Sequence, residues 1–301
     1  MAQPTIHLVD ASVYVFRAYY SVAPEFVDHE EQPVHAVYGF LGFLLNLLEQ
    51  ARPTHVMVAF DQSLTTSFRN AIYPEYKANR ELPPADLDRQ FEYCREVCAA
   101  LGLAASSDDS YEADDLIGSA LAQLRPQGWR GVIVSADKDL TQLVGEHDRV
   151  WDFARNQRYG VEGVVERMGV RPDQVADFLA LTGDAVDNIP GVPGVGPKTA
   201  AALLAHFGTL DALLARVDEV PYLRLRGAAA TAAKIRAHRE QALLSRQLTV
   251  IALDAPVITE PEHYGVRVPD EAIVENLMER LRFGPMTRRR VRDHMVRMQG
   301  G

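Results

Sequence analysis

The sequence predicts an α/β protein in which a mostly parallel central sheet carries helices on both faces and is followed by a helical region. Three observations support this prediction. Short apolar strand patterns alternate with helical patterns over the first 165 residues, which is typical of a sheet covered on both sides. From about residue 170 nearly every pattern is helical. Acidic residues directly follow several strand patterns, and active sites of such sheets lie beyond the carboxyl ends of the strands.

The strand patterns are short and apolar, so we expect them to be buried in the sheet. They occupy residues 5–10, 54–60, 131–135, 149–153 and 157–161. Helical patterns separate them, at residues 12–20, 36–51, 86–101 and 112–124. Residues 62–85 form no clear element, and a long connection inside a compact domain is either disordered or functional.

The second region reads as helices joined by short connections. We place the boundary near residue 165, which divides the chain into regions 1–165 and 166–301. The helices expected in the second region are 172–182, 197–207, 209–216, 229–247 and 270–282.

Composition is that of an ordinary soluble globular protein, with 47% hydrophobic and 24% charged residues among 301. No apolar run approaches the roughly 20 residues that cross a bilayer, and the N-terminus has no basic segment or cleavage site of a signal peptide. Cys94 and Cys98 lie four apart in a helical pattern without further cysteines. We therefore expect buried thiols, no zinc site and a reducing cytoplasm.

Charge is unevenly distributed along the chain. The net charge is −10, but residues 1–170 hold 14 Lys and Arg against 25 Asp and Glu, whereas residues 171–301 hold 17 against 16. Within the second region, residues 221–250 contain six basic residues and one acid. An acidic half and a locally basic half fit a protein that binds metal ions with one part and phosphates with the other.

Nine acids end a strand pattern or begin a helical one. They are Asp10, Asp61, Glu112, Asp114, Asp115, Asp137, Asp139, Asp184 and Asp187. Singly, each fits a helix cap or a surface residue, and acids suit the first turn of a helix. Glu112 and Asp115 are three apart, as are Asp184 and Asp187, so each pair would share a helical face. Glu112 and Asp114 would diverge on a regular helix, so some of these acids are expected to act through water.

So many carboxylates in one place would repel one another and raise their pKa values unless cations neutralised them. Magnesium suits such a site because it takes one or two carboxylates per ion and keeps several waters. Two ions about 3.5–4 Å apart can activate water and stabilise the leaving oxygen of a phosphodiester. The joint placement of the acids therefore predicts a site for two or more Mg²⁺ ions.

The glycine-rich stretch 191–199 has the spacing of a phosphate-binding P-loop, but Pro197 stands where that motif needs lysine. A better interpretation is a tight glycine hairpin between two helices, with Pro197 in the first turn of the second helix. Backbone N–H groups there, with Lys198 beside them, would hold a phosphate without reading sequence. The alternative is a simple turn between helices.

At this point the chain resembles a known family, the bacterial 5′-nucleases, which comprise flap endonucleases and the 5′-3′ exonuclease domain of DNA polymerase I. The resemblance covers nearly the whole chain and rests on seven motifs. They are Val9-Asp10, Phe60-Asp61, Tyr76 to Arg80, Tyr111 to Asp115, Ala136 to Leu140, Thr182 to Asp184 with Asp187 to Gly191, and Gly194 to Ala200.

The resemblance implies a PIN-like 5′-nuclease fold, with region 1–165 as the catalytic domain and region 166–301 as a DNA-binding region. Within them it implies an arch at about 62–90, through which a 5′ single strand passes, and a helix-hairpin-helix at about 182–207. Asp10, Asp61, Glu112, Asp114 and Asp115 would form one metal group, and Asp137, Asp139, Asp184 and Asp187 the other. The ions would be Mg²⁺, replaceable by Mn²⁺, and several family members also hold K⁺ at the hairpin.

The resemblance also assigns roles to residues that touch DNA. Lys77 and Arg80 would contact the scissile phosphate, and the spacing Tyr-Lys-x-x-Arg would place both on one helical face. Phe16 stands where the family often has a tyrosine that stacks on a base, and phenylalanine keeps the stacking face. The other expected DNA contacts are Arg69, Tyr76, Gly191, Gly194, Gly196, Lys198 and Thr199.

Asp10 is followed by Ala11 where polymerase-fused members usually have glycine, and no polymerase sequence follows residue 301, so we expect a free-standing nuclease or an excised domain. The expected activity is metal-dependent hydrolysis of DNA at 5′ ends and 5′-flap junctions, by a cytoplasmic monomer that joins the nucleoid when bound to DNA and has no membrane contact. Two alternatives stay open. One is a PIN-like ribonuclease, and the other is a DNA-junction binder without catalysis.

Overall fold

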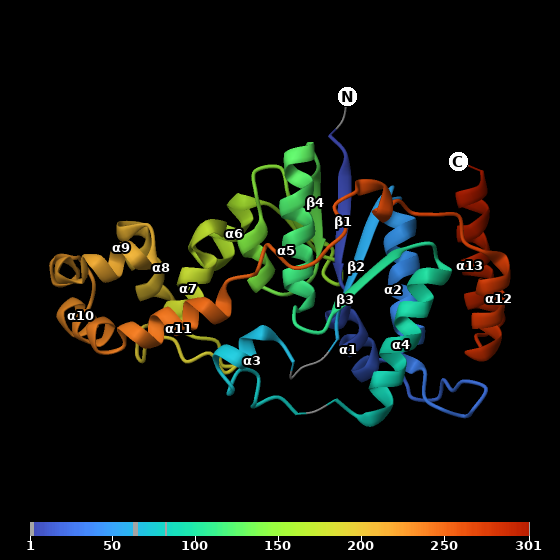
Figure 1. Ribbon diagram of the computed structural model, residues 1–301, viewed down its shortest axis with the longest axis horizontal. Coiled ribbons are helices and arrows are strands. Elements are labelled where there is room, and N and C mark those ends of the chain that lie inside the picture. Colours follow the sequence, from blue (N-terminus) through green and yellow to red (C-terminus); the bar gives the residue numbers. More distant parts are fainter. Residues whose placement is uncertain (1–2, 63–65, 82, 301) are drawn as a thin grey trace.

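The computed structural model describes residues 3–62, 66–81 and 83–300, and its centre is a six-stranded sheet (Figure 1). The strand order is β3-β2-β1-β4-β5-β6. The strands are β1 Thr5–Asp10, β2 His55–Asp61, β3 Ala104–Asp108, β4 Arg130–Val134, β5 Arg149–Asp152 and β6 Gln157–Tyr159. All neighbouring pairs are parallel except β5 with β6. The prediction of a mostly parallel sheet is confirmed.

Strand β3 was not expected from the sequence. Its residues Ala-Ala-Ser-Ser-Asp lack the apolar run of a buried strand, and all of them except Ala104 are exposed or partly exposed. The strand forms because it pairs with β2 on one side only, at the edge of the sheet, where burial is shallow.

Both faces of the sheet are covered, as the sequence predicts. One face packs α5 (Ala113–Leu124) against Ile6, Leu8 and Ile133 of the strands. On the opposite face lie α1 Ala11–Ser21, α2 His35–Ala51 and α4 Ala85–Ala100, which bury Val9 and Val58. Figure 1 shows α5 on one side of the strands and α2 and α4 on the other. A short helix, α3 (Phe68–Ile72), lies in the long connection before α4.

The second half is helical in the part of the chain that the structure describes, with no strand after β6. Its helices are α6 Val161–Met168, α7 Val175–Thr182, α8 Pro197–Phe207, α9 Leu210–Ala215, α10 Ala228–Ala237, α11 Arg239–Thr249, α12 Glu271–Arg280 and α13 Pro285–Gln299. Short 3-10 turns are η1 Arg125–Gln127, η2 Asp139–Leu143, η3 Pro172–Gln174, η4 Val217–Tyr222 and η5 Pro261–Tyr264. The single helix expected at 229–247 is wrong, because the chain leaves helical geometry at His238 (φ −114°, ψ 28°) and forms α10 and α11.

The last two helices return to the α/β half of the molecule. In Figure 1, α12 and α13 lie beside α2 and α4, on the opposite side of the sheet from α7 to α11. Leu277 and Val291 are buried in the same core as α2 and α4. Residues 271–299 therefore pack with the first region, although they follow the helical lobe in sequence. None of the described helices is long and apolar enough to cross a membrane.

Candidate active site

The acids predicted at strand ends meet at one edge of the sheet. Asp10 is the last residue of β1 and Asp61 the last of β2, while Asp137 follows the end of β4 by three residues. These three strands are neighbours in the order β2-β1-β4 and run parallel. Their carboxyl ends therefore lie side by side, where open α/β sheets carry their binding sites.

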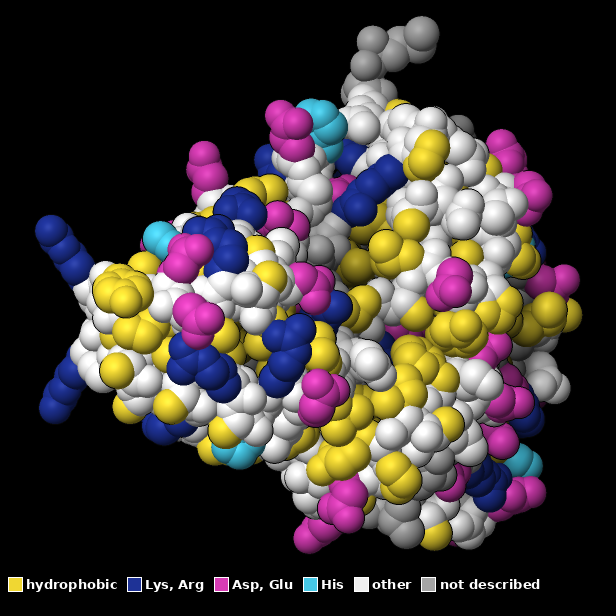
Figure 2. Space-filling view, turned by 60° about the vertical axis from the view of Figure 1, so that its left-hand side comes forward, with side chains coloured by type: hydrophobic (Ala, Val, Ile, Leu, Met, Phe, Trp, Pro, Cys, Tyr) yellow, Lys and Arg dark blue, Asp and Glu magenta, His cyan; other side chains and the backbone are white. Residues whose placement is uncertain are grey.

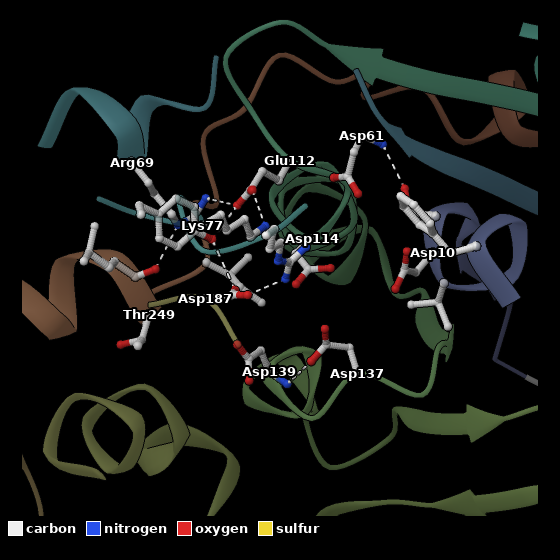
Figure 3. Close-up of a pocket in the computed structure, with 17 residues that line it drawn as sticks. Asp10, Asp61, Arg69, Lys77, Glu112, Asp114, Asp137, Asp139, Asp187 and Thr249 are labelled. Atoms are coloured by element: carbon white, nitrogen blue, oxygen red, sulfur yellow. Dashed lines mark hydrogen bonds and ion pairs between the residues drawn. The ribbon is translucent and has the colours of Figure 1, made fainter. Parts of the chain in front are cut away.

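A cavity of about 270 Å³ opens at this edge, and Figure 3 shows acidic side chains directed into it from several elements. Seven of the nine predicted acids line it, namely Asp10, Asp61, Glu112, Asp114, Asp137, Asp139 and Asp187. The lining also includes five residues expected at the substrate, which are Phe16, Arg69, Tyr76, Lys77 and Arg80. Asp115 and Asp184 are not among the lining residues.

The start of α5 explains how Glu112 and Asp114 both reach the cavity. Glu112 is the N-cap of the helix and has extended backbone angles (φ −82°, ψ 166°), so the two residues do not diverge as they would inside a regular helix. Asp115 is the third helical residue and accepts a hydrogen bond from the Glu112 N–H at 3.0 Å. The acidic triplet thus combines a helix cap with two cavity carboxylates.

Asp115 and Arg69 form a buried ion pair behind the cavity. The Asp115 carboxylate accepts both guanidinium Nη atoms of Arg69, at 2.7 and 2.8 Å, and also the N–H of Ala252 at 2.8 Å. The remaining Arg69 donors bond the carbonyls of Leu248 and Val250 and the Glu112 carboxylate. All five N–H donors of Arg69 therefore have protein partners. This geometry makes the pair structural and leaves Arg69 no donor for a DNA phosphate.

Of the second acidic pair, Asp184 and Asp187, only Asp187 lines the cavity. Asp187 accepts a hydrogen bond from Arg80, whereas Asp184 is buried and accepts the N–H of Val186 at 2.9 Å and the Lys138 ammonium. Asp184 also begins a two-residue bridge with Ile189, which fixes the loop after α7. The helical lobe thus contributes Asp187 directly to the cavity and Asp184 at its edge.

Basic side chains from residues 76–80 lie over the acids. Lys77 donates to Glu112, and the buried Tyr76 hydroxyl donates to the same carboxylate at 3.0 Å. The expectation that Lys77 and Arg80 share a helical face is wrong, because residues 74–80 form turns and Lys77 has φ +57°. The turns nevertheless direct both cations into the cavity, so their shared location comes from tertiary structure rather than from helical spacing.

Burial and mutual repulsion govern the pKa values of the carboxylates. Burial, with Asp61 and Asp137 nearby, raises the pKa of Asp10 to about 7. Burial and Asp137 raise the pKa of Asp139 to about 7, and burial with four neighbouring acids raises that of Asp114 well above its usual value. Burial acts in the same direction on Glu112, but Lys77 and Arg69 outweigh it and lower the Glu112 pKa. Of the four carboxylates whose pKa is shifted here, only that of Glu112, beside the cations, is shifted toward the charged form.

The donor set fits divalent cations of the magnesium type. Among the described residues no three His, Cys, Asp or Glu side chains converge as a ready-made cage. Magnesium does not need one, since it uses one or two carboxylates and keeps its waters. All the acidic donors are oxygens, and the buried Oδ1 of Asp139 has no hydrogen-bond partner in this structure. Cations would also relieve the repulsion that raises the pKa values of Asp10, Asp114 and Asp139.

One supporting residue was missed by sequence reasoning. The buried Ser135 hydroxyl donates to Asp10 at 2.8 Å and accepts the N–H of Asp137 at 3.0 Å. It therefore links the acid at the end of β1 to the acid that follows β4. Its position directly after β4 was a usable indication, because polar residues at that edge of the sheet face the site. Phe16, on α1, contacts Phe91 edge-on at 5.6 Å between ring centroids and lines the cavity as expected.

The glycine hairpin between α7 and α8 forms as predicted. Gly191 and Gly194 have φ of +61° and +76°, and a Cβ on Gly191 would lie 2.2 Å from the backbone nitrogen of Gly183. Gly196 is the N-cap of α8 and Pro197 its first residue. Lys198 is exposed and Thr199 partly exposed in the first turn of that helix. The backbone N–H groups at this helix start are thus open to a ligand.

Fold and site together define an α/β protein with an acidic cavity at the sheet edge and a helical lobe beside it. The comparisons with known proteins name the family. Residues 5–169 match the model of the 5′-3′ exonuclease N-terminal resolvase-like domain, and residues 170–272 match its C-terminal SAM fold. The chain therefore belongs to the 5′-3′ exonuclease family.

The chain is also similar in sequence to bacterial DNA polymerases I. The chain is 37% identical over 291 residues to DNA polymerase I of Rhizobium leguminosarum, covering 94% of this chain and 28% of that protein. It is 41% identical over 285 residues to DNA polymerase I of Pseudomonas aeruginosa, covering 94% of this chain and 31% of that protein. The chain thus spans less than a third of the length of these relatives.

Solved structures share the fold at low sequence identity. The T5 5′-exonuclease with bound zinc ions aligns with a TM-score of 0.65 and 19% identity over 98% of this chain and 99% of that chain. The catalytic core of Rad2 in complex with DNA substrate aligns with a TM-score of 0.65 and 15% identity over 98% of this chain and 92% of that chain.

Proposed function

We propose that this chain is a structure-specific, divalent-metal-dependent 5′-nuclease that hydrolyses DNA phosphodiester bonds at 5′ ends and at 5′-flap junctions. The observation that carries the proposal is the cavity itself. Seven carboxylates from both halves of the chain line it, and Lys77 and Arg80 reach into the same space. A site of this kind can hold cations against one side of a phosphate and basic side chains against another.

The acids take two kinds of role in this proposal. Asp10, Asp61, Glu112, Asp114, Asp137, Asp139 and Asp187 bind two or more Mg²⁺ ions, which Mn²⁺ replaces, either directly or through water. Such ions supply an activated water and neutralise charge on the leaving oxygen. Asp184 holds Lys138 at the edge of the cavity, and Asp115 holds Arg69. These two acids therefore support the metal site through their partners.

Basic and aromatic residues position the DNA. Lys77 and Arg80 bind and orient the scissile phosphate, because they are the cations that reach the cavity from residues 76–80. Tyr76 holds Glu112 with its hydroxyl, and burial raises the pKa of that hydroxyl so that it remains a donor. Phe16 offers its ring to a base at the cavity wall.

The helical lobe holds the duplex. Gly191 and Gly194 shape the hairpin, while the N–H groups after Gly196, with Lys198 and Thr199, contact the phosphate backbone. A K⁺ ion bound by hairpin carbonyls would bring positive charge to the same place. A potassium requirement for duplex binding, absent for single strands, would support that ion.

The domain assignment follows from these roles. Residues 1–165 form the catalytic domain, and the arch expected at about 62–90 ends before α4, which starts at Ala85 and packs on the sheet. Residues 63–65 and 82 lie outside the described residues. The region 166–301 binds duplex DNA, except that residues 271–299 pack with the catalytic domain. The protein acts as a monomer in the cytoplasm and joins the nucleoid when bound to DNA.

The proposal is tested by Mg²⁺-dependent cleavage of a 5′-end-labelled DNA flap duplex. A matched single strand and an RNA version of the flap are run beside it. Cleavage at the junction of the DNA flap supports the proposal. Preferred cleavage of RNA would instead indicate a PIN-like ribonuclease, and tight junction binding without cleavage under any divalent ion would indicate a binding protein.

A further inference from the structure

The distribution of lysines in this chain is unusual. Among 31 basic residues only four are lysines, at positions 77, 138, 198 and 234. Lys77 and Lys138 bond carboxylates at the edge of the cavity. Lys198 and Lys234 lie in the helical lobe, and both are exposed. Three of the four thus already belong to the proposed site, and Lys234 is the one without a role.

Lys234 lies across the glycine hairpin, 40 residues from it in sequence. A Cβ built on Gly194 would be 2.3 Å from the Lys234 Nζ, 3.3 Å from Cε and 3.7 Å from Cδ. The aliphatic stem therefore follows the bare backbone of Gly194, and the ammonium group lies beside the hairpin. Any side chain at position 194 would displace it.

The helices on both sides of the break at His238 contact the hairpin. After the break, α11 fastens the hairpin from one side, because the Ser245 hydroxyl accepts the N–H of Gly191 at 3.1 Å and Gln241 donates to its carbonyl at 2.7 Å. Before the break, α10 carries Lys234 to the hairpin.

The Lys234 ammonium has no protein partner in the described part of the chain. Neither a hydrogen bond nor an ion pair joins Lys234 or Lys198 to a carboxylate there, whereas nearby Arg236 pairs with Asp218 and Arg246 with Asp211. Figure 2 shows Lys and Arg side chains projecting from the helical lobe. Two unpaired ammonium groups thus accompany the hairpin.

We propose that Lys234 binds the phosphodiester backbone of duplex DNA, and that it and Lys198 hold the same stretch of backbone at the hairpin. The proposal rests on the proposed nuclease function and adds a positioning residue to it. A lysine binds phosphate as a point charge without fixed geometry, so the contact would not depend on sequence. The anchored duplex is held while the 5′ end enters the acidic cavity.

The test measures the affinity of the full chain for a flap duplex in EDTA, between 50 and 300 mM salt. Each neutralised phosphate contributes about 0.9 to the slope of log affinity against log salt concentration. Lys234→Gln is expected to make the slope shallower by about this amount and to weaken binding several-fold at low salt. Lys234→Arg should restore the slope, and Arg155→Gln, which removes an exposed charge paired with Asp152, should leave it unchanged.

An unchanged slope for Lys234→Gln, with an unchanged melting temperature, would overturn the inference. Cleavage kinetics separate it from the proposed function. If the wild type cleaves the flap in Mg²⁺, Lys234→Gln should raise KM and leave kcat unaltered, and a lower kcat at unaltered KM would also overturn the inference. If the wild type cleaves nothing while the slope still changes, the nuclease proposal fails and the duplex contact stands.

Discussion

At the scale of single residues, the buried carboxylates of the acidic cavity destabilise the metal-free fold when they are charged. Asp10 is buried at the end of β1, near Asp61 and Asp137, and its pKa is raised to about 7. A carboxyl whose pKa is higher in the folded than in the unfolded chain stabilises the fold while it is protonated. That contribution is fully present below the unfolded-state pKa and is lost as the pH rises through about 7.

Asp10→Asn should therefore stabilise the metal-free protein at pH 8. Asparagine keeps an acceptor for Ser135 and removes the charge, and a pKa displaced by one is worth about 1.4 kcal/mol. We expect a gain of about 1 kcal/mol or more in EDTA, which vanishes below about pH 4 where aspartate is neutral in both states. Thermal unfolding in EDTA across this pH range measures it.

The gain should shrink in millimolar Mg²⁺, because the wild type then gains ion-binding free energy that the variant lacks. The exposed Asp109 gives the control, and Asp109→Asn should change neither stability nor its response to Mg²⁺. A wild type whose melting temperature is the same in EDTA and Mg²⁺ would contradict this account.

Arg69 and Arg80 allow a structural cation to be compared with one that we propose binds DNA. Arg69→Leu leaves the buried Asp115 without its partner, and breaking such a pair costs about 3–5 kcal/mol. The Arg80 side chain is 34% exposed, so Arg80→Leu should change the free energy of unfolding little while cleavage falls. Urea unfolding and flap cleavage of both variants test this. A stable Arg69→Leu variant with impaired DNA binding would reverse the two roles.

At the scale of elements, the hairpin between α7 and α8 depends on glycine in two different ways. Gly191 has φ +61° and packs against Gly183, whereas Gly196 has φ −90° and faces open space. Gly191→Ala should thus lower the free energy of unfolding by more than about 1 kcal/mol, while Gly196→Ala should not. Chemical denaturation of the two variants, with a probe that reports unfolding of the helical lobe, measures the difference. Equal losses in the two variants would show that backbone conformation is not the determinant.

The elements predicted from the sequence are those with strong patterns of their own. Strands β1, β2 and β4 are continuous apolar runs, and α8 carries a glycine N-cap followed by proline, so their types and approximate limits were predictable. Strand β3 was missed because its polar edge residues lack such a run. The break at His238 was missed because helical periodicity continues on both sides of it.

The candidate site was predictable to the same extent. The carboxyl ends of neighbouring parallel strands lie at the same edge of the sheet. The meeting of Asp10, Asp61 and Asp137 could therefore be inferred from the sequence. The sequence could not separate Asp115 from Asp114, because the difference is the distant Arg69, 46 residues away. It also could not show that Lys77 adopts φ +57°, since that depends on how the turns 74–80 meet the helical lobe.

At the scale of the whole molecule, the C-terminal helices pack against the α/β half of the chain. Leu277 on α12 is buried in the core shared with α2 and α4, whereas Ile273 on the same helix is largely exposed. Leu277→Asn should cost about 2–5 kcal/mol by leaving a cavity and a buried amide. Ile273→Asn should cost little. Hydrogen exchange in α2 and α4 checks the location, since losses confined to the helical lobe would contradict this packing.

The central claim is that the carboxylates of the acidic cavity perform metal-dependent cleavage and that duplex binding does not require them. Single-turnover cleavage of a 5′-flap duplex in Mg²⁺, with binding measured in EDTA, tests it most directly on wild type, Asp114→Asn and Asp109→Asn. The account predicts that all three bind the duplex, that wild type and Asp109→Asn cleave at the junction, and that Asp114→Asn does not cleave. Wild-type cleavage by Asp114→Asn, or loss of binding together with cleavage, would contradict it.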